Sequence, residues 1–130
     1  MHITPLYKAI RRGHAEAARL LLEHGAYVDW IDEHGWTYLH YAARVGVIEA
    51  AKVLLHYSIE IDASDCGKLT SLHIAVCKGY YGMAKLLIDH GANVNSIDKY
   101  NDTPLDDAKR GNNKMMIDLL RAHGAINNKC

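Results

Sequence analysis

The segment TYLHYA at residues 37–42 returns as TSLHIA at residues 70–75, a step of 33 residues. The same step leads back to TPLYKA at residues 4–9 and on to TPLDDA at residues 103–108. Two further columns keep this register, an alanine five residues and a leucine seventeen residues after each threonine: Ala9, Ala42, Ala75 and Ala108; Leu21, Leu54, Leu87 and Leu120. Self-similarity at a fixed step of this size predicts a repeat protein whose units stack on one another.

Each 33-residue unit is predicted to form two short helices separated by a tight turn. The threonine can cap the first helix with its side-chain oxygen, and Pro5 and Pro104 fit the first helical turn. Gly13 is expected to end the first helix because the turn there needs a positive φ, and Asn112 takes this place in the last unit. The predicted helices span residues 5–12, 15–24, 38–45, 48–57, 71–78, 81–90, 104–110 and 113–122.

These helices are too short to be stable alone. Isolated helices of fewer than about 12 residues are marginal in water, so burial must come from stacking each pair on its neighbours. The leucine column is expected to form the core: Leu21, Leu54, Leu87 and Leu120. We therefore predict an all-α solenoid of four helix-turn-helix units, joined by hairpin-like loops. It forms a single domain over residues 1–130, with units at about 4–36, 37–69, 70–102 and 103–130.

Composition narrows the class of protein. Apolar residues make up 49% and charged residues 23% of the chain, which is typical of a globular protein. Lysine plus arginine and aspartate plus glutamate both total 15, so no bulk positive field favours nucleic acid as a ligand. No apolar run approaches the roughly 18 residues of a membrane span, and no secretory signal is seen. Cys66, Cys77 and Cys130 cannot all pair within one chain, so we expect a reducing, intracellular setting, the cytoplasm.

The repeated segments resemble a known family. TYLHYA and TSLHIA, 33 residues apart, are close to the Thr-Pro-Leu-His-x-Ala signature of ankyrin repeats. LLIDHGANVN at residues 86–95 is similar to the second half of such a repeat, and the resemblance extends from Thr4 to about Asn128. It implies an ankyrin-repeat solenoid that binds a protein partner without catalysis. The implied binding surface is concave and consists of the hairpin tips and the exposed side of the first helices.

Mapped onto this sequence, the concave surface mixes charged and aromatic residues. Its members are Arg11, Arg12, Glu33, His34, Trp36, Arg44, Val45, Cys66, Leu69, Cys77, Lys78, Lys99, Tyr100, Asp102 and Arg110. Trp36 lies where the repeat pattern does not require a large ring, and Trp, Tyr and Arg are enriched at binding hot spots. Trp30 has two equal interpretations: it contacts a partner, or it covers the apolar edge between the first two units. The mixture suits a partner with acidic and apolar groups, and we expect the chain itself to be a monomer.

Some positions depart from the family pattern. Ser58 replaces the glycine that follows the second helix, so that turn is expected to be strained or differently built. Lys68 stands where the first hairpin has Gly35, and Gly67 is expected to shift that turn by one residue. Only three residues precede Thr4, and no separate N-terminal cap is visible. The alternative to a partner-binding module is therefore an engineered or excised repeat scaffold with no evolved partner.

The nine histidines prompt a search for metal or catalytic sites. His40 and His73 occupy the signature position, where the resemblance implies an imidazole bonded to the turn backbone. His24, His90 and His123 lie beside the glycine that ends a second helix, where a partly charged imidazole stabilises the helix C-terminus. No HExxH, GxSxG or glycine-rich phosphate loop occurs. We therefore expect no catalytic site, no metal and no cofactor.

Two further positions have chemical alternatives. Cys66 and Cys77 are expected on the same side of the molecule, where a surface thiol of some reactivity is the alternative to an inert one. The family resemblance also implies a modification, because an asparaginyl hydroxylase acts on ankyrin repeats at the Asn of a Val-Asn turn with a Leu eight residues before it. Leu87 and Asn95 match that arrangement. The alternative is a structural asparagine in a turn.

Overall fold

The computed structural model describes residues 3–129, and that part of the chain contains eight helices. They are α1 (Pro5–Arg11), α2 (Ala15–Glu23), α3 (Tyr38–Val45), α4 (Ile48–His56), α5 (Ser71–Lys78), α6 (Tyr81–Asp89), α7 (Pro104–Arg110) and α8 (Lys114–Ala122). Every boundary lies within one residue of the sequence prediction, so the predicted all-α architecture is confirmed. Cys130 lies outside the described residues.

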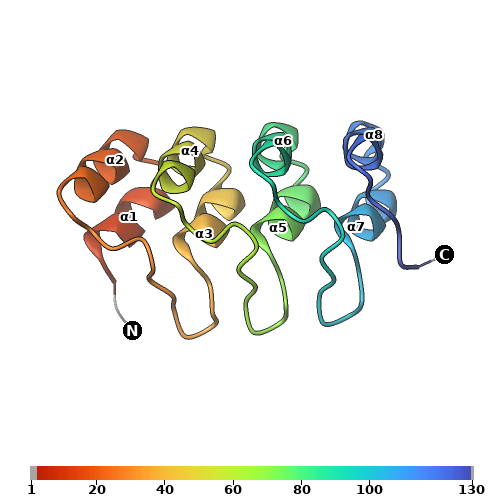
Figure 1. The fold of residues 1–130 in the computed structure, drawn as a ribbon, viewed down its shortest axis with the longest axis horizontal. Coiled ribbons are helices and arrows are strands. Elements are labelled where there is room, and N and C mark those ends of the chain that lie inside the picture. Colours follow the sequence, from red (N-terminus) through yellow and green to blue (C-terminus); the bar gives the residue numbers. More distant parts are fainter. Residues whose placement is uncertain (1–2, 130) are drawn as a thin grey trace.

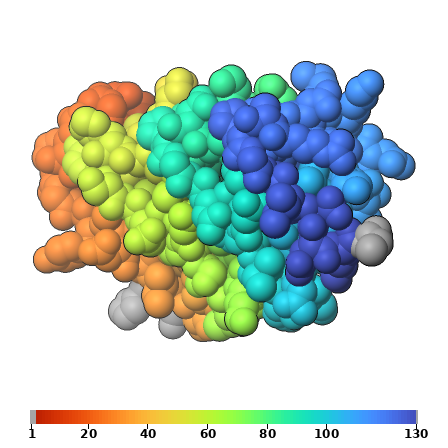
Figure 2. All heavy atoms as spheres, turned by 45° about the vertical axis from the view of Figure 1, so that its right-hand side comes forward, coloured from red at the N-terminus to blue at the C-terminus, as the bar shows by residue number. Residues whose placement is uncertain are grey.

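The helices form two rows (Figure 1). The first helices of the pairs, α1, α3, α5 and α7, pack side by side in one row, and the second helices, α2, α4, α6 and α8, pack in the other. The loops between pairs extend beyond the first-helix row. In Figure 2 the sequence colours follow one another as bands across the molecule, because each pair packs against its neighbours. Within residues 3–129, no helix is long and apolar enough to cross a bilayer.

A threonine begins each first helix, as predicted. Its side-chain oxygen accepts the backbone N–H of the residue three positions later, at Thr4, Thr37, Thr70 and Thr103. At Thr37 and Thr70 the histidine three residues later bonds back to the threonine N–H, which completes a capping box. These caps satisfy backbone groups that a short helix would otherwise leave unpaired.

The turns keep their backbone geometry even where glycine is replaced. Ser58 has φ 62°, in the same left-handed region as Gly25 with φ 94°. Lys68 likewise has φ 62°, in the place of Gly35 with φ 79°. The expected one-residue shift at Gly67 is wrong, because Lys68 itself adopts the left-handed conformation that the hairpin needs. Such residues cost about 1–2 kcal/mol relative to an unstrained backbone, and the packing of the units overrides that cost.

The core lies between the two rows of helices. Leu54, Leu87 and Leu120 are completely buried, as the leucine column predicts. Leu21 is only half-buried, so the prediction is wrong for this member of the column. The helices α4, α6 and α8 each pack against the second helix of the preceding pair, whereas α2 belongs to the first pair and packs only against α4 in the second-helix row. Leu21 instead lines a hollow at that end of the molecule.

Candidate functional site

The two signature histidines have a structural role. His40 is fully buried; its Nδ1 accepts the backbone N–H of Thr37 at 3.0 Å, and its Nε2 donates to the Leu69 carbonyl at 2.8 Å. Burial lowers the pKa of His40 below its ordinary value, which keeps the ring neutral and preserves this arrangement. His73 repeats it with the Thr70 N–H and the Asp102 carbonyl. Each histidine therefore ties its own helix to the next hairpin, and the expected backbone role is confirmed.

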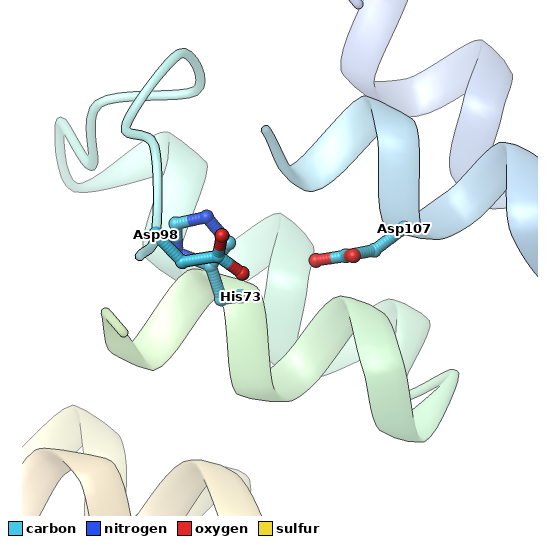
Figure 3. Close-up of side chains that lie close together, drawn as sticks. All are labelled: His73, Asp98 and Asp107. Atoms are coloured by element: carbon cyan, nitrogen blue, oxygen red, sulfur yellow. The ribbon is translucent and has the colours of Figure 1, made fainter. Parts of the chain in front are cut away.

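A cluster of three possible metal ligands surrounds one of these histidines. Ligand atoms of His73, Asp98 and Asp107 lie within 4.8 Å of one another, and Figure 3 shows the Asp107 carboxylate of α7 pointing toward the other two side chains. Metal binding needs an imidazole nitrogen with a free lone pair.

The hydrogen bonds of the cluster do not leave that lone pair. Nδ1 of His73 already accepts the Thr70 N–H, and Nε2 donates to the Asp102 carbonyl. Asp98 Oδ1 accepts two backbone N–H groups of its hairpin, those of Tyr100 and Asp102. The cluster is therefore explained as hairpin and capping chemistry, and its residues do not fit a metal site.

Cys77 lies next to this cluster. Cys77 is exposed, like Cys66, but partial burial of its thiol raises the pKa to about 12, and the neighbouring Asp107 carboxylate adds to the effect. Burial also raises the pKa of Asp107 above its ordinary value. Because the thiolate is the reactive form, the alternative of a reactive thiol is not supported at Cys77. The Cys66 side chain is exposed in its hairpin.

The ends of the first helices and the hairpin loops form one face, which we call the hairpin–helix surface. Between α3 and α5 this face contains a hollow of about 220 Å³. Its lining is largely apolar, with two cationic side chains: Trp36, Arg44, Leu69, Ile74, Cys77 and Lys78. All but Ile74 are residues that the sequence assigned to the binding surface. Ile74 was missed because it follows the signature His73, at a place that looks like core.

Trp36 is fixed in place at the edge of this hollow. Its Nε1 donates to Asp65 Oδ2 at 2.8 Å, and its ring lies 4.9 Å from the Tyr41 ring and 5.5 Å from the His40 ring. The Arg44 guanidinium lies over the same ring, 5.8 Å from its centre. Trp36 is half-buried, so it packs between units and also presents ring surface to solvent.

A second hollow of about 360 Å³ lies between the hairpin tips. Trp36 and Leu69 line both hollows, and the second one adds His34, Cys66, Lys99 and Tyr100 from the predicted set. The Lys99 ammonium lies over the Tyr100 ring, 5.2 Å from its centre, and Tyr100 is 64% exposed. Nine of the predicted residues are thus brought together around two adjoining hollows.

The cations of the hairpin–helix surface differ in their partners. Among the described residues, Arg44, Lys78 and Lys99 are exposed and make no ion pair. Arg110, in contrast, pairs with Asp102 at 3.1 Å and with Asp107 at 3.0 Å. The two cations that line the hollow between α3 and α5, Arg44 and Lys78, are therefore free of ion pairs within the described part of the chain.

Asp102 is not available to a partner as the sequence predicted. It is 5% exposed, and its carboxylate is held by Arg110 and by Lys129, the latter at 3.0 Å. Burial alone would raise the pKa of Asp102, but hydrogen bonds from Lys129 and Arg110 bring it below its ordinary value. Asp102 is buried because Arg110 and Lys129, both from later parts of the chain, pack over its carboxylate.

The remaining predicted residues lie at the edges of the face. Arg11 donates to the Tyr7 hydroxyl at 2.6 Å and lies over the Tyr41 ring. Glu33 lies 3.8 Å from the His34 imidazole, measured from Oε1 to Nε2. The exposed Arg12 and the half-buried Val45 line neither of the two hollows.

A family model for ankyrin repeats, built from three copies, matches residues 1–65 and again residues 61–129. The chain belongs to the ankyrin-repeat family. A search of curated proteins gave no match. Ankyrin repeats are generally protein-interaction modules and are typically non-enzymatic. The hollows and exposed cations of this ankyrin-repeat chain are therefore of interest as binding features.

Trp30 packs against the ankyrin core. Its ring is stacked on that of Tyr38, 4.7 Å away and inclined by 10°, and lies 5.3 Å from the Tyr7 ring. The residue is half-buried between the first two pairs. Of the two alternatives left open by the sequence, covering the apolar edge is the one that the structure supports.

Asn95 connects two neighbouring ankyrin loops. Its Oδ1 accepts the backbone N–H of Ile126 at 2.9 Å, and its Nδ2 donates to the Gly124 carbonyl at 3.3 Å. Both ends of the side-chain amide are thus engaged, which supports the structural alternative. Hydroxylation of Asn95 stays a prediction.

Sequence reasoning missed one hollow. It has about 510 Å³ and lies at the α1–α2 end of the ankyrin stack, lined mainly by apolar and aromatic residues that include Leu21, Tyr27 and Trp30. Tyr27 is 85% exposed. The available signal was the leucine column itself, since its first member has no earlier helix pair in this chain to cover it.

Proposed function

We propose that this ankyrin-repeat chain binds a protein partner through its hairpin–helix surface and does not catalyse a reaction. The observation that supports the proposal is that two hollows meet at Trp36 and Leu69, beside cations that make no ion pair within the described part of the chain. Aromatic and arginine side chains in such places carry much of the energy of protein interfaces.

The surface is preorganised for binding. Trp36 is held by Asp65 and by stacking on its neighbours, and the hairpins are tied to one another by bonds such as that from the Cys66 N–H to the His34 carbonyl at 3.0 Å. Little side-chain and loop entropy is then lost when a partner docks, which leaves more of the contact energy for affinity.

We also propose which ligands the protein does not bind, its cellular compartment and its oligomeric state. Balanced charge argues against nucleic acid and membrane surfaces as ligands. An odd number of cysteines suits a reducing compartment, so we place the protein in the cytoplasm. We expect residues 1–130 to act as one domain and as a monomer, which light scattering would measure.

The test uses a partner captured from native extract by cross-linking, identified by mass spectrometry and then purified. Arg44→Ala and Lys78→Ala should weaken its binding by about 1–4 kcal/mol, the range for hot-spot residues, with the thermal midpoint nearly unchanged. Trp36→Ala should weaken binding too, but it also removes the bond to Asp65 and should lower the midpoint.

The matched controls are Glu16→Ala and Glu49→Ala on the second helices. Both side chains are exposed and pair with a neighbour on their own helix, so neither binding nor stability should change much. The proposal fails if these controls abolish binding while Arg44→Ala and Lys78→Ala bind normally. Failure to capture any specific partner would favour the alternative of a repeat scaffold without one.

Asn95 provides a separate test of the family resemblance. Exposure of the protein to an asparaginyl hydroxylase, followed by peptide mass spectrometry, should show the mass of one added oxygen on Asn95. Because the Asn95 amide bonds to Ile126 and Gly124, the modified fraction should rise when the last pair is destabilised. An unmodified Asn95 under both conditions would leave only the structural role.

A further inference from the structure

The hollow between α3 and α5 has the size of a side-chain pocket. At about 220 Å³ it is smaller than the roughly 300–1,000 Å³ of pockets that enclose small organic ligands. Its apolar lining comes from the Trp36 ring, Leu69 and Ile74. An apolar side chain that a partner inserts here would leave water and pack against three large apolar groups.

The fourth wall of the hollow is also uncharged. The Cys77 thiol, whose pKa is raised by burial, stays protonated at neutral pH and behaves as a small apolar group. The Asp107 carboxylate beyond it is engaged by Arg110. Apart from Arg44 and Lys78 at its mouth, the residues that line the hollow are uncharged, so an apolar occupant packs against uncharged side chains.

The mouth of the hollow is positive. Arg44 lies in the last turn of α3 with an exposed guanidinium, and Lys78 is the last residue of α5 with an exposed ammonium. Within the described residues neither cation forms an ion pair with the hairpin acids Asp65 and Asp98, whose carboxylates are held by the Trp36 indole and by backbone N–H groups. Cations at helix C-termini suit the helix dipole, but that partial charge cannot cancel two full charges.

We infer that this hollow receives one large apolar side chain, such as Leu, Met or Phe, from a partner segment that carries Asp or Glu on either side of it. The inference rests on the proposed function and names the chemistry of the partner. The apolar side chain fills the hollow, and the flanking carboxylates pair with Arg44 and Lys78 at its mouth. Lys99, above the adjoining hollow, extends the positive field along the segment.

A segment of other composition fits less well. Lysine or arginine beside the anchor would be repelled by two cations at the mouth, and a wholly apolar segment would cover those charges without pairing them. An acidic segment without an anchor would leave the hollow filled with water. The combination of acid and apolar anchor is the one that satisfies both the lining and the rim.

The experiment selects peptides from a random twelve-residue display library against the wild-type protein and against the double variant Arg44→Glu/Lys78→Glu. The matched control is Lys114→Glu/Arg121→Glu on α8, which makes the same change in net charge at exposed cations that form no ion pair with any residue from 3 to 129. Wild type and control should both enrich Leu, Met or Phe flanked by Asp or Glu. The double variant should not enrich such peptides.

An enriched peptide is then synthesised as the probe. Its affinity should fall at least about tenfold for Arg44→Glu/Lys78→Glu, and should fall as salt is added because the rim charges are exposed. Replacing its apolar anchor by Ala, or its acids by Gln and Asn, should each weaken it. The indole N–H signal of Trp36, one of two tryptophans in the chain, should shift on binding.

The outcomes separate this inference from the proposed function. If the enriched peptides shift the Trp36 signal but lack acids, or bind the charge-reversed variant equally, the inference is wrong and the proposed surface stands. If the captured protein partner responds only to changes on the second helices, the proposed function itself fails. Selection that enriches nothing on wild type relative to the charge-reversed variant also overturns the inference.

Discussion

Truncation of one leucine in the column tests the stacked core most directly. Leu54 on α4 is 0% exposed, and Leu54→Ala removes three carbon groups from it. At about 0.8 kcal/mol for each buried carbon group, the lost transfer free energy is about 2.4 kcal/mol. The cavity left between α2, α4 and α6 adds to this, because stacked helices collapse only in part. The free energy of unfolding should therefore fall by about 3–4 kcal/mol, inside the usual 2–5 kcal/mol range for buried Leu→Ala.

Leu21→Ala is the matched control, since it makes the same chemical change in the same column. Leu21 is half-buried and borders an open hollow, so about half of the transfer term and little cavity term apply, giving about 1 kcal/mol. Urea unfolding followed by circular dichroism would measure both variants, with the slope compared to confirm that the array still unfolds as one unit. Equal losses at Leu21 and Leu54, or a negligible loss at Leu54, would refute the proposed packing.

Three further outcomes follow from other contacts. His40→Ala should lower the free energy of unfolding by about 2 kcal/mol, measured by urea unfolding, because it leaves the buried Thr37 N–H without its partner and removes one of the two hydrogen bonds that the Leu69 carbonyl accepts, the other coming from the Asp65 N–H. Ser58→Gly should raise the thermal midpoint because it relieves a positive φ of 62°; the strain of about 1–2 kcal/mol, less the greater backbone entropy that glycine loses, leaves a gain of about 1 kcal/mol, and an unchanged midpoint would show that this turn is unstrained. Burial alone would raise the pKa of Asp106, but backbone N–H groups, among them those of residues 103, 128 and 129, bring it below its ordinary value. The ionised Asp106 carboxylate therefore stabilises the fold at neutral pH, and this contribution is lost as pH falls below about 3.9. Amide shifts of residues 128 and 129 should then move with pH in wild type and stay flat in Asp106→Asn.

The arrangement of helices was predictable because its signals are local. A threonine whose side chain caps the following turn, and a left-handed residue after each helix, lie within a few positions of the boundary that they set. These capping and turn signals then recur in each of the four 33-residue units. Even the hairpin at Lys68 follows the pattern, since neighbouring units impose the backbone conformation on whichever residue stands there.

The details of the candidate site were less predictable because they depend on contacts between units. Asp102 looked like an exposed hairpin acid, and its burial comes from Arg110 and from Lys129, which lies 27 residues later. Trp36 was expected to be free of the framework, yet its indole is held by Asp65 from the next hairpin. Periodicity identifies which residues are equivalent, but it does not say which side chains will reach across to the next unit.

The hydrogen bonds between neighbouring units have a constant reach along the chain. His40 bonds to residue 69 and His73 to residue 102, each 29 positions on, while the Asn93 N–H bonds back to Asp62 and the Ile126 N–H to Asn95, each over 31 positions. Removing or inserting one complete 33-residue segment would therefore bring equivalent partners together again, whereas removing a single residue would misalign every such bond at one junction. A gene encoding this protein can lose or gain a repeat equivalent to residues 70–102 while the new junction keeps this bonding scheme, which the first unit, with Tyr7 in the place of the histidine, does not share.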